Sequence, residues 1–187
     1  MTRLMYDSVN PSAIPSTAVM VAGYVNGPKS QWPASGWDRW GTGVPKLRID
    51  VNGSDPYGSD VADVENGNLT IAGAVEWVKL RQARGWWSAA YSDLSHHGEL
   101  TTAMGSLDCE YWIASWGISE AQAESMLTGR VVAVQFFNHP VTNYDVSVVN
   151  DAWFPSPPPT PPTPAPHLES VTLTGTYSDG NRKTVYL

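Results

Sequence analysis

The chain has 187 residues, of which 42% are hydrophobic and 16% charged, and this composition excludes wholesale disorder. Its formal net charge of −7 argues against a nucleic-acid backbone as a partner. The single cysteine, Cys109, excludes an internal disulfide framework and a Cys-rich zinc site. No apolar run approaches the roughly 20 residues that span a bilayer. Residues 1–10 lack the basic and apolar regions of a secretory signal peptide, so none is expected.

Apolar runs of β-forming residues recur between turn and helix signals along residues 1–154. They predict strands at 4–9, 19–25, 45–51, 60–66, 86–92, 110–116, 131–137 and 144–150. Helical spacing and capping residues predict helices at roughly 70–84, 94–105 and 119–128. The alternation of the two element types indicates an α/β fold.

The length of this body limits the kind of α/β fold that it can form. A complete eight-fold β/α barrel takes about 250 residues, so a body of 154 must lack some helices. Only residues 138–143 separate the last two strands, too few for a parallel crossover, so these strands should be antiparallel. We expect an irregular TIM-like β/α barrel with missing helices, β/α units early in the chain and a final antiparallel hairpin. An open α/β sheet is the alternative.

The composition changes abruptly after Phe154. Residues 155–166 hold eight prolines in twelve positions, which predicts a polyproline II linker about 37 Å long at ~3.1 Å per residue. Residues 167–187 read as a β-hairpin with a turn at Asp179-Gly180. Because a lone hairpin is marginally stable in water, we expect this tail to pair with a protein partner or with a second copy of the chain. A frayed tail without a partner is the alternative.

Four carboxylates are expected at one rim of the barrel, where parallel strands end and where the chemistry of such barrels takes place. Asp7 lies in the second half of the first strand, and Asp63 and Glu65 end the fourth, two residues apart and therefore on one face. Asp145 begins the last strand, whose start reaches the same rim if that strand is antiparallel. Convergence of these acids predicts a catalytic site, whereas a solvated strand end is the alternative for Asp-x-Glu alone.

Paired carboxylates suit glycoside hydrolysis, in which one acid must stay protonated while the other stays ionised. Crowding by Asp63 and by the barrel walls should raise the pKa of Glu65, which makes Glu65 the expected proton donor. Asp63 would stabilise the developing oxocarbenium ion or orient a substrate amide. Asp7 and Asp145 would hold sugar hydroxyls or water.

Aromatic side chains accompany these acids. Tyr91 and Trp116 end the fifth and sixth strands and are candidate substrate-binding residues, and the loop 28–43 carries Trp32, Trp37 and Trp40. Indole faces stack on sugar rings, so the loop is a candidate glycan wall. Alternatively, its rings form a roof over a thin barrel that lacks a helix at this point.

Three other features are expected to carry no chemistry. Asp50, Asn52, Ser54 and Asp55 imitate the start of a calcium loop, but the sixth position is not Gly and the twelfth, Val61, is not acidic. No metal and no cofactor are therefore expected. His96 and His97 are interpreted as polar residues at the start of a helix, and Cys109, between two acids, as an inert thiol.

The motifs resemble a known family when they are taken in chain order. They are Tyr-Asp-Ser-Val (6–9), Asp-Val-Glu (63–65), Tyr-Ser (91–92), Tyr-Trp-Ile-Ala-Ser-Trp (111–116), Val-Gln-Phe (134–136) and Tyr-Asp-Val-Ser-Val-Val (144–149). Residues 1–154 thus resemble the Chalaropsis-type muramidases, glycoside hydrolase family 25, and their shortened relatives in actinobacteria and actinobacteriophages. The resemblance implies an irregular β/α barrel that cleaves the β-1,4 bond between N-acetylmuramic acid and N-acetylglucosamine. It implies Glu65 as the acid, Asp63 as the assisting carboxylate, subsite roles for Asp7 and Asp145, and Gln135 among the substrate-binding residues.

The sequence therefore predicts a peptidoglycan muramidase whose partner is the glycan strand of the cell wall. The expected setting is a phage virion, or the host cytoplasm before lysis, with action at the bacterial wall. A non-catalytic virion structural protein, such as a minor tail protein, or a glycan-binding protein on a degenerate hydrolase barrel is the alternative.

Overall fold

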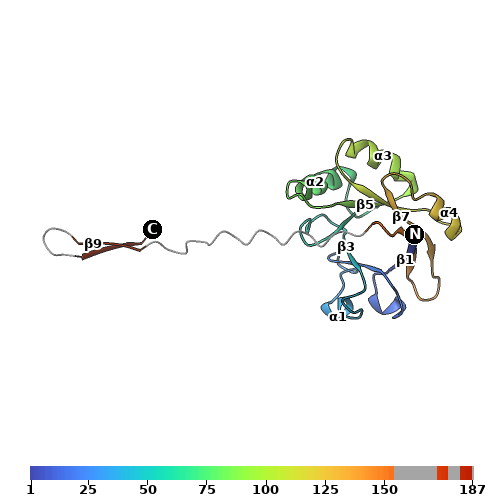
Figure 1. The fold of residues 1–187 in the computed structure, drawn as a ribbon, viewed down its shortest axis with the longest axis horizontal. Coiled ribbons are helices and arrows are strands. Elements are labelled where there is room, and N and C mark those ends of the chain that lie inside the picture. Colours follow the sequence, from blue (N-terminus) through green and yellow to red (C-terminus); the bar gives the residue numbers. More distant parts are fainter. Residues whose placement is uncertain (154–171, 177–181, 187) are drawn as a thin grey trace. The chain divides into compact units, whose positions relative to one another are not determined.

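The computed structural model describes residues 1–153, 172–176 and 182–186, in two compact units, Met1–Pro155 and Ser156–Leu187. Eight strands form a closed barrel in the first unit (Figure 1). They are β1 (Thr2–Asp7), β2 (Val21–Tyr24), β3 (Lys46–Asp50), β4 (Val61–Asp63), β5 (Ala89–Asp93), β6 (Glu110–Ala114), β7 (Val131–Asn138) and β8 (Asp145–Asn150). Each predicted strand corresponds to one of these, and closure of the ring excludes the open sheet.

The barrel combines parallel and antiparallel pairing. β1 to β7 follow one another in parallel. β8 runs antiparallel to β7, as the short 138–143 connection predicted, and it closes the ring by pairing antiparallel with β1. The carboxyl ends of β1–β7 and the start of β8 therefore share one rim.

The three predicted helices are all present, but the β/α units expected early in the chain do not form. The three longest helices, α2 (Ile71–Gln82), α3 (Leu94–Met104) and α4 (Glu120–Ser125), follow β4, β5 and β6 in the middle of the barrel, not early in the chain. The earlier connections contain only the 3-10 turn η1 (Pro11–Ala13) and the single turn α1 (Ala34–Trp37). Figure 1 shows α1 across the ring from α3. Residues 8–60 contain six prolines and residues 61–139 none, which explains the contrast because proline interrupts helices.

Tryptophan side chains cover the barrel where helices are missing. Trp32 and Trp40 pack with Ile14, Ala18 and Val21 in a core cluster on the outer side of β2. A second cluster fills the barrel interior, and a third lies between the sheet and α2–α4. The loop between β2 and β3 thus does the covering that a crossover helix does elsewhere.

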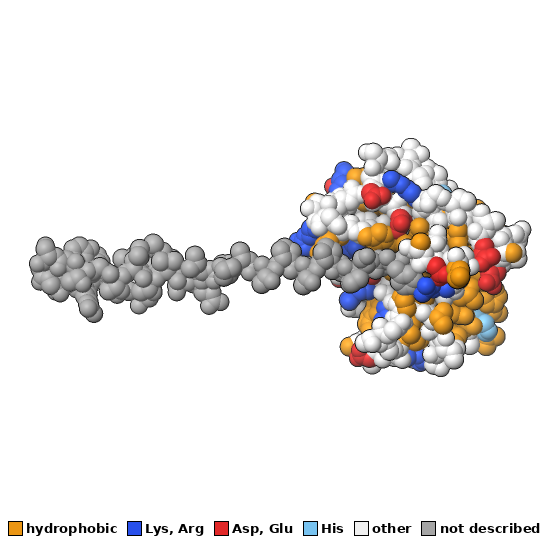
Figure 2. Space-filling view, in the orientation of Figure 1, with side chains coloured by type: hydrophobic (Ala, Val, Ile, Leu, Met, Phe, Trp, Pro, Cys, Tyr) orange, Lys and Arg blue, Asp and Glu red, His pale blue; other side chains and the backbone are white. Residues whose placement is uncertain are grey.

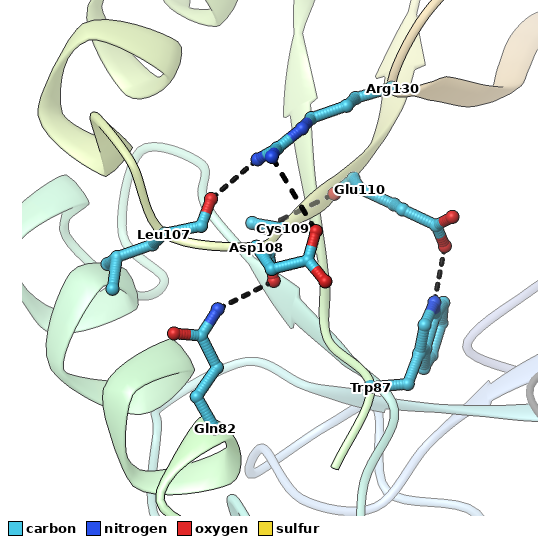
Figure 3. A network of polar contacts seen from close by, with 7 residues as sticks. All are labelled: Gln82, Trp87, Leu107, Asp108, Cys109, Glu110 and Arg130. Carbon is cyan, nitrogen blue, oxygen red and sulfur yellow. Dashed lines mark hydrogen bonds and ion pairs between the residues drawn. The ribbon is translucent and has the colours of Figure 1, made fainter. Parts of the chain in front are cut away.

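A polar network links neighbouring loops at the end of the barrel opposite the acidic rim (Figure 3). Trp87, just before β5, donates its indole hydrogen to Glu110 at the start of β6. Arg130, just before β7, donates to the Leu107 carbonyl at 2.5 Å and forms an ion pair with Asp108 at 3.6 Å. These contacts tie together the loops that begin β5, β6 and β7, so this end is structural.

Cys109 belongs to the same network. Its Sγ donates to the Glu110 carbonyl at 3.3 Å, and its side chain is fully buried. Burial raises the pKa of the thiol to about 12. This agrees with the expectation of an unreactive cysteine.

The second unit contains a two-stranded antiparallel sheet of β9 (Thr172–Thr176) and β10 (Arg182–Tyr186), in register Thr172 to Tyr186. The predicted linker 155–166 and the predicted turn at Asp179-Gly180 lie outside the described residues. None of the helices in the described part of the chain is long and apolar enough to cross a bilayer. On the face of the barrel seen in Figure 2, Lys and Arg side chains are scattered and do not form one basic patch.

Candidate functional site

The pairing of β8 with β1 brings two of the predicted acids together. Asp7 ends β1 and Asp145 begins β8, and the antiparallel register places the two residues directly opposite each other. Directly opposed residues in such a ladder have Cβ atoms about 4.5–5.5 Å apart. A contact across 138 positions of sequence therefore puts two carboxylates at one point of the rim.

The other two acids lie at the same rim, one at the end of β4 and one in the turn after it, and they differ in burial. β4 ends at Asp63, whose side chain is 3% exposed, and Glu65 lies in the following turn with its side chain exposed. The turn is closed by a hydrogen bond of 3.0 Å from the Asn68 amide to the Glu65 carbonyl. The predicted strand 60–66 is therefore too long at this end, because β4 stops at Asp63 and Glu65 lies beyond it.

A chain of hydrogen bonds through the barrel interior fixes Asp7. The Tyr91 hydroxyl donates to Gln135 Oε1 at 2.6 Å, and Gln135 Nε2 donates to Asp7 Oδ1 at 3.0 Å. All three side chains are buried. Tyr91 and Gln135, predicted as substrate-binding residues, thus use their polar atoms to orient a carboxylate of the site.

Charges of other acids at the rim raise the pKa of Asp7, Asp63 and Glu65, and none of the ion pairs among the described residues involves the four acids. Burial raises the pKa of Asp7 well above its ordinary value, and the charges of Asp145, Asp63 and Glu65 raise it further. Burial also raises the pKa of Asp145, against a hydrogen bond from Asn138 that lowers it. The rim therefore favours protonated carboxyl groups.

Asp63 is the acid whose environment is best defined. Burial, followed by the charge of Glu65, raises its pKa from 3.8 to about 7, although a hydrogen bond from Asn68 Nδ2 opposes this. Its Oδ2 accepts that bond at 3.0 Å, whereas its buried Oδ1 has no hydrogen-bond partner. Buried polar atoms in native proteins are nearly always paired, so this unpaired oxygen adds to the cost of burying Asp63 as a carboxylate.

Glu65 has a raised pKa as well. Desolvation is the largest cause and the charge of Asp93 the next, while contacts with Tyr91 and His96 lower it. The like charges that raise the pKa of Glu65 are those of Asp93, at the end of β5, and Asp145, and not that of Asp63 as expected. A cavity of about 220 Å³ is lined by residues 64–71, which include Glu65, and by His96.

The tryptophans of loop 28–43 do not form an open wall. Trp32 and Trp40 are each 3% exposed and stack on each other with ring centroids 5.6 Å apart. Trp32 donates its indole hydrogen to the Ser8 carbonyl at 2.8 Å. Trp37 is half-buried and packs against Trp32. The alternative interpretation, a roof over the barrel, describes Trp32 and Trp40, because their faces are covered by protein.

Trp116 differs, since its side chain is 51% exposed in the turn after β6.

Three contributors to the site were missed in the sequence. Tyr24 ends β2, and its pKa is raised first by burial and then by the charges of Asp7, Asp63, Asp145 and Glu65. Asn68 and Asn138 each donate a hydrogen bond to one of the four acids. Tyr24 could have been found by applying the strand-end argument to every polar residue of the predicted strands. Asn68 makes a contact that depends on loop geometry, whereas Asn138 ends β7 directly opposite Asp145 in the antiparallel β7–β8 register.

The segment that imitates a calcium loop has its oxygens occupied by the protein itself. Asp50 accepts hydrogen bonds from the backbone amides of Gly53 at 2.7 Å and Asp55 at 2.9 Å, and from the Trp77 indole at 3.0 Å. Its carboxylate thus holds the β3–β4 loop against α2. Within residues 1–153 and the two described strands of the tail, no group of three or more His, Cys, Asp or Glu residues is arranged to hold a metal ion.

The rim therefore unites acids from β1, from β8, and from the end of β4 and the turn that follows it. A scan against protein-family models found no match, and searches of curated proteins and of solved structures found none either.

Proposed function

We propose that this chain is a peptidoglycan muramidase, which cleaves the β-1,4 bond between N-acetylmuramic acid and N-acetylglucosamine, on a shortened TIM-like barrel. One observation carries the proposal: the β1–β8 pairing brings Asp145 to the rim that holds Asp7, Asp63 and Glu65. Acids that mutually favour protonation suit glycoside hydrolysis, in which one carboxyl must donate a proton near neutral pH.

Glu65 is the proposed proton donor because it combines a raised pKa with access to solvent and lies beside a cavity. In the reaction, its proton passes to the glycosidic oxygen as the bond from that oxygen to the anomeric carbon breaks. Positive charge then develops on the sugar ring, and the ionised form of Asp63 would stabilise it. The unpaired Oδ1 of Asp63 can alternatively accept a hydrogen bond from a substrate amide.

The remaining groups have supporting roles in this proposal. Asp7, held by Gln135, and Asp145, held by Asn138, would bind sugar hydroxyls or the attacking water. Trp116 offers the exposed indole face on which a sugar ring could stack. Such a site acts on glycan strands of the bacterial wall, and the protein would then be a phage product that acts at that wall.

The test compares wild type, Glu65→Gln and Glu99→Gln on purified cell walls, with loss of turbidity and release of reducing ends as readouts. Glu99 is exposed on α3 and serves as the matched control. Loss of a general acid lowers rates by about 10²–10⁴-fold, so Glu65→Gln should lose activity by that factor while Glu99→Gln keeps it. Equal activity of Glu65→Gln and wild type would exclude the proposed donor. Wall binding by a wild type that never releases reducing ends would favour the glycan-binding alternative.

The two-stranded β9–β10 sheet is the proposed contact with a protein partner or a second copy. Each of its strands pairs with only one neighbour among the described residues, and such edges can accept a further strand. Removal of residues 155–187 should leave turnover of soluble glycan fragments unchanged and abolish assembly, measured by size-exclusion chromatography with light scattering. An unchanged mass in solution and unchanged partner recovery would refute this role.

A further inference from the structure

Asp93 and His96 form a fixed carboxylate–imidazole pair at the junction of β5 and α3. Asp93 is the N-cap of α3, and its Oδ1 accepts hydrogen bonds from the His96 amide at 2.9 Å and from Ser95 Oγ at 2.5 Å. Its Oδ2 lies 2.7 Å from Nδ1 of the His96 ring. Backbone and side-chain contacts therefore hold both groups in one orientation, and Nε2 is the ring nitrogen that remains for other interactions.

The ends of β4 and β5 bring this pair near Glu65. β4 and β5 are parallel with Asp63 paired to Tyr91, and the Val64 amide donates to the Tyr91 carbonyl at 2.8 Å. Glu65 and Asp93 are the residues two positions beyond that pair on their respective segments. His96 and Glu65 also line the same 220 Å³ cavity. His96, which is held by Asp93, and the proposed proton donor thus face a common space.

We propose that Asp93 and His96 are positioning residues that control whether Glu65 carries a proton, with ionised Asp93 favouring protonated Glu65 and protonated His96 opposing it. This inference rests on the proposed function for its catalytic meaning. The physical basis is that a negative charge disfavours a second one nearby, while an imidazolium bound to the first charge cancels its field.

The ionisation of the pair agrees with this assignment. Hydrogen bonds from Ser95 and His96 lower the pKa of Asp93 to about 2, so its charge persists across the range in which Glu65 titrates. The charge of Asp93 raises the pKa of Glu65 and that of His96 lowers it. Both side chains of the pair are more than one third exposed, so salt should weaken their effect.

Other titratable groups also act on this rim, and the test must separate them from the pair. Besides Asp93 and His96, the groups whose charges interact with Glu65 are Asp7, Tyr24, Asp63, Tyr91 and Asp145. All five lie on β1, β2, β4, β5 and β8. Among the ion pairs of the described residues, a histidine takes part only in the pair of Asp93 and His96. A change in the Glu65 titration that depends on the His96 imidazole therefore identifies this pair.

The experiment follows the Glu65 carboxyl carbon by NMR during a pH titration of wild type, Asp93→Asn, His96→Gln and the exposed control Asp38→Asn. Asparagine keeps the N-cap, so Asp93→Asn removes the charge without removing the helix start. The midpoint of Glu65 should move down in Asp93→Asn, move up in His96→Gln, and stay at the wild-type value in Asp38→Asn. The shift in Asp93→Asn should shrink at high salt.

The same variants are then assayed for release of reducing ends as a function of pH. The high-pH limb should move in the direction of the Glu65 midpoint in each variant. A Glu65 midpoint that is the same in Asp93→Asn and wild type would overturn the inference even if the walls are cleaved. If the Glu65 midpoints move as expected but the protein cleaves no wall, the inferred effect of Asp93 and His96 on Glu65 stands and the muramidase proposal is rejected. The two failures are therefore distinguishable.

Discussion

Replacement of Asp63 by Asn should stabilise the barrel at alkaline pH. Burial places the pKa of this carboxyl at about 7 in the folded protein, against an ordinary value of 3.8. The unfolded chain thus releases its proton at lower pH than the folded chain does. Wild-type stability falls as pH rises from about 4 to about 7, because ionisation of Asp63 is easier in the unfolded state.

The size of this effect follows from the two pKa values. The difference between about 7 and 3.8 corresponds to roughly 4 kcal/mol at about 1.36 kcal/mol for each pKa unit. Between about pH 5 and about pH 8, integration of the linkage relation gives roughly 2–3 kcal/mol. Asn cannot ionise, and its side-chain oxygen can still accept the hydrogen bond from Asn68. The variant should therefore lack this part of the pH dependence.

The assay is urea unfolding of wild type, Asp63→Asn and the exposed control Asp38→Asn at about pH 5 and about pH 8. The gain in unfolding free energy of Asp63→Asn over wild type should be larger at the higher pH by roughly 2–3 kcal/mol. The Asp38→Asn control should show no such dependence. A gain that is the same at both pH values would refute the argument that ionisation of the buried Asp63 destabilises the folded protein.

Two further predictions test the packing of Trp32 against β2 and the burial of Cys109. A Cβ added at Gly23 would lie 2.5 Å from the Trp32 ring, so Gly23→Ala should lower the free energy of unfolding by about 1–3 kcal/mol. A Cβ added at Gly43 meets open space, so Gly43→Ala should leave the stability unchanged. Thermal unfolding measures both variants, and equal melting temperatures would contradict the close packing of Trp32 on Gly23. The Cys109 thiol should resist a disulfide reagent at about pH 8 in the folded protein and react fully in denaturant, because its pKa is about 12 and it is fully buried; rapid reaction of the native protein would contradict this.

Much of the barrel could be predicted because its strands and helices are encoded locally. Strand-forming runs such as the one that became β7, and caps such as Thr70 and Ser119, act through neighbouring residues and appear in the structure close to their expected positions. The six-residue gap at 138–143 was enough to set the direction of β8, because chain length alone excludes a parallel crossover there.

Tertiary structure alone decided the properties of the site. The depth difference between Asp63 and Glu65 arises because β4 ends at Asp63, and the effect of Asp93 on Glu65 depends on the β4–β5 register. Burial of Trp32 follows from the missing crossover helix, which leaves β2 to be covered by a loop. Sequence determines which groups can ionise or stack, whereas burial and distance, which set their pKa and exposure, exist only once distant segments meet.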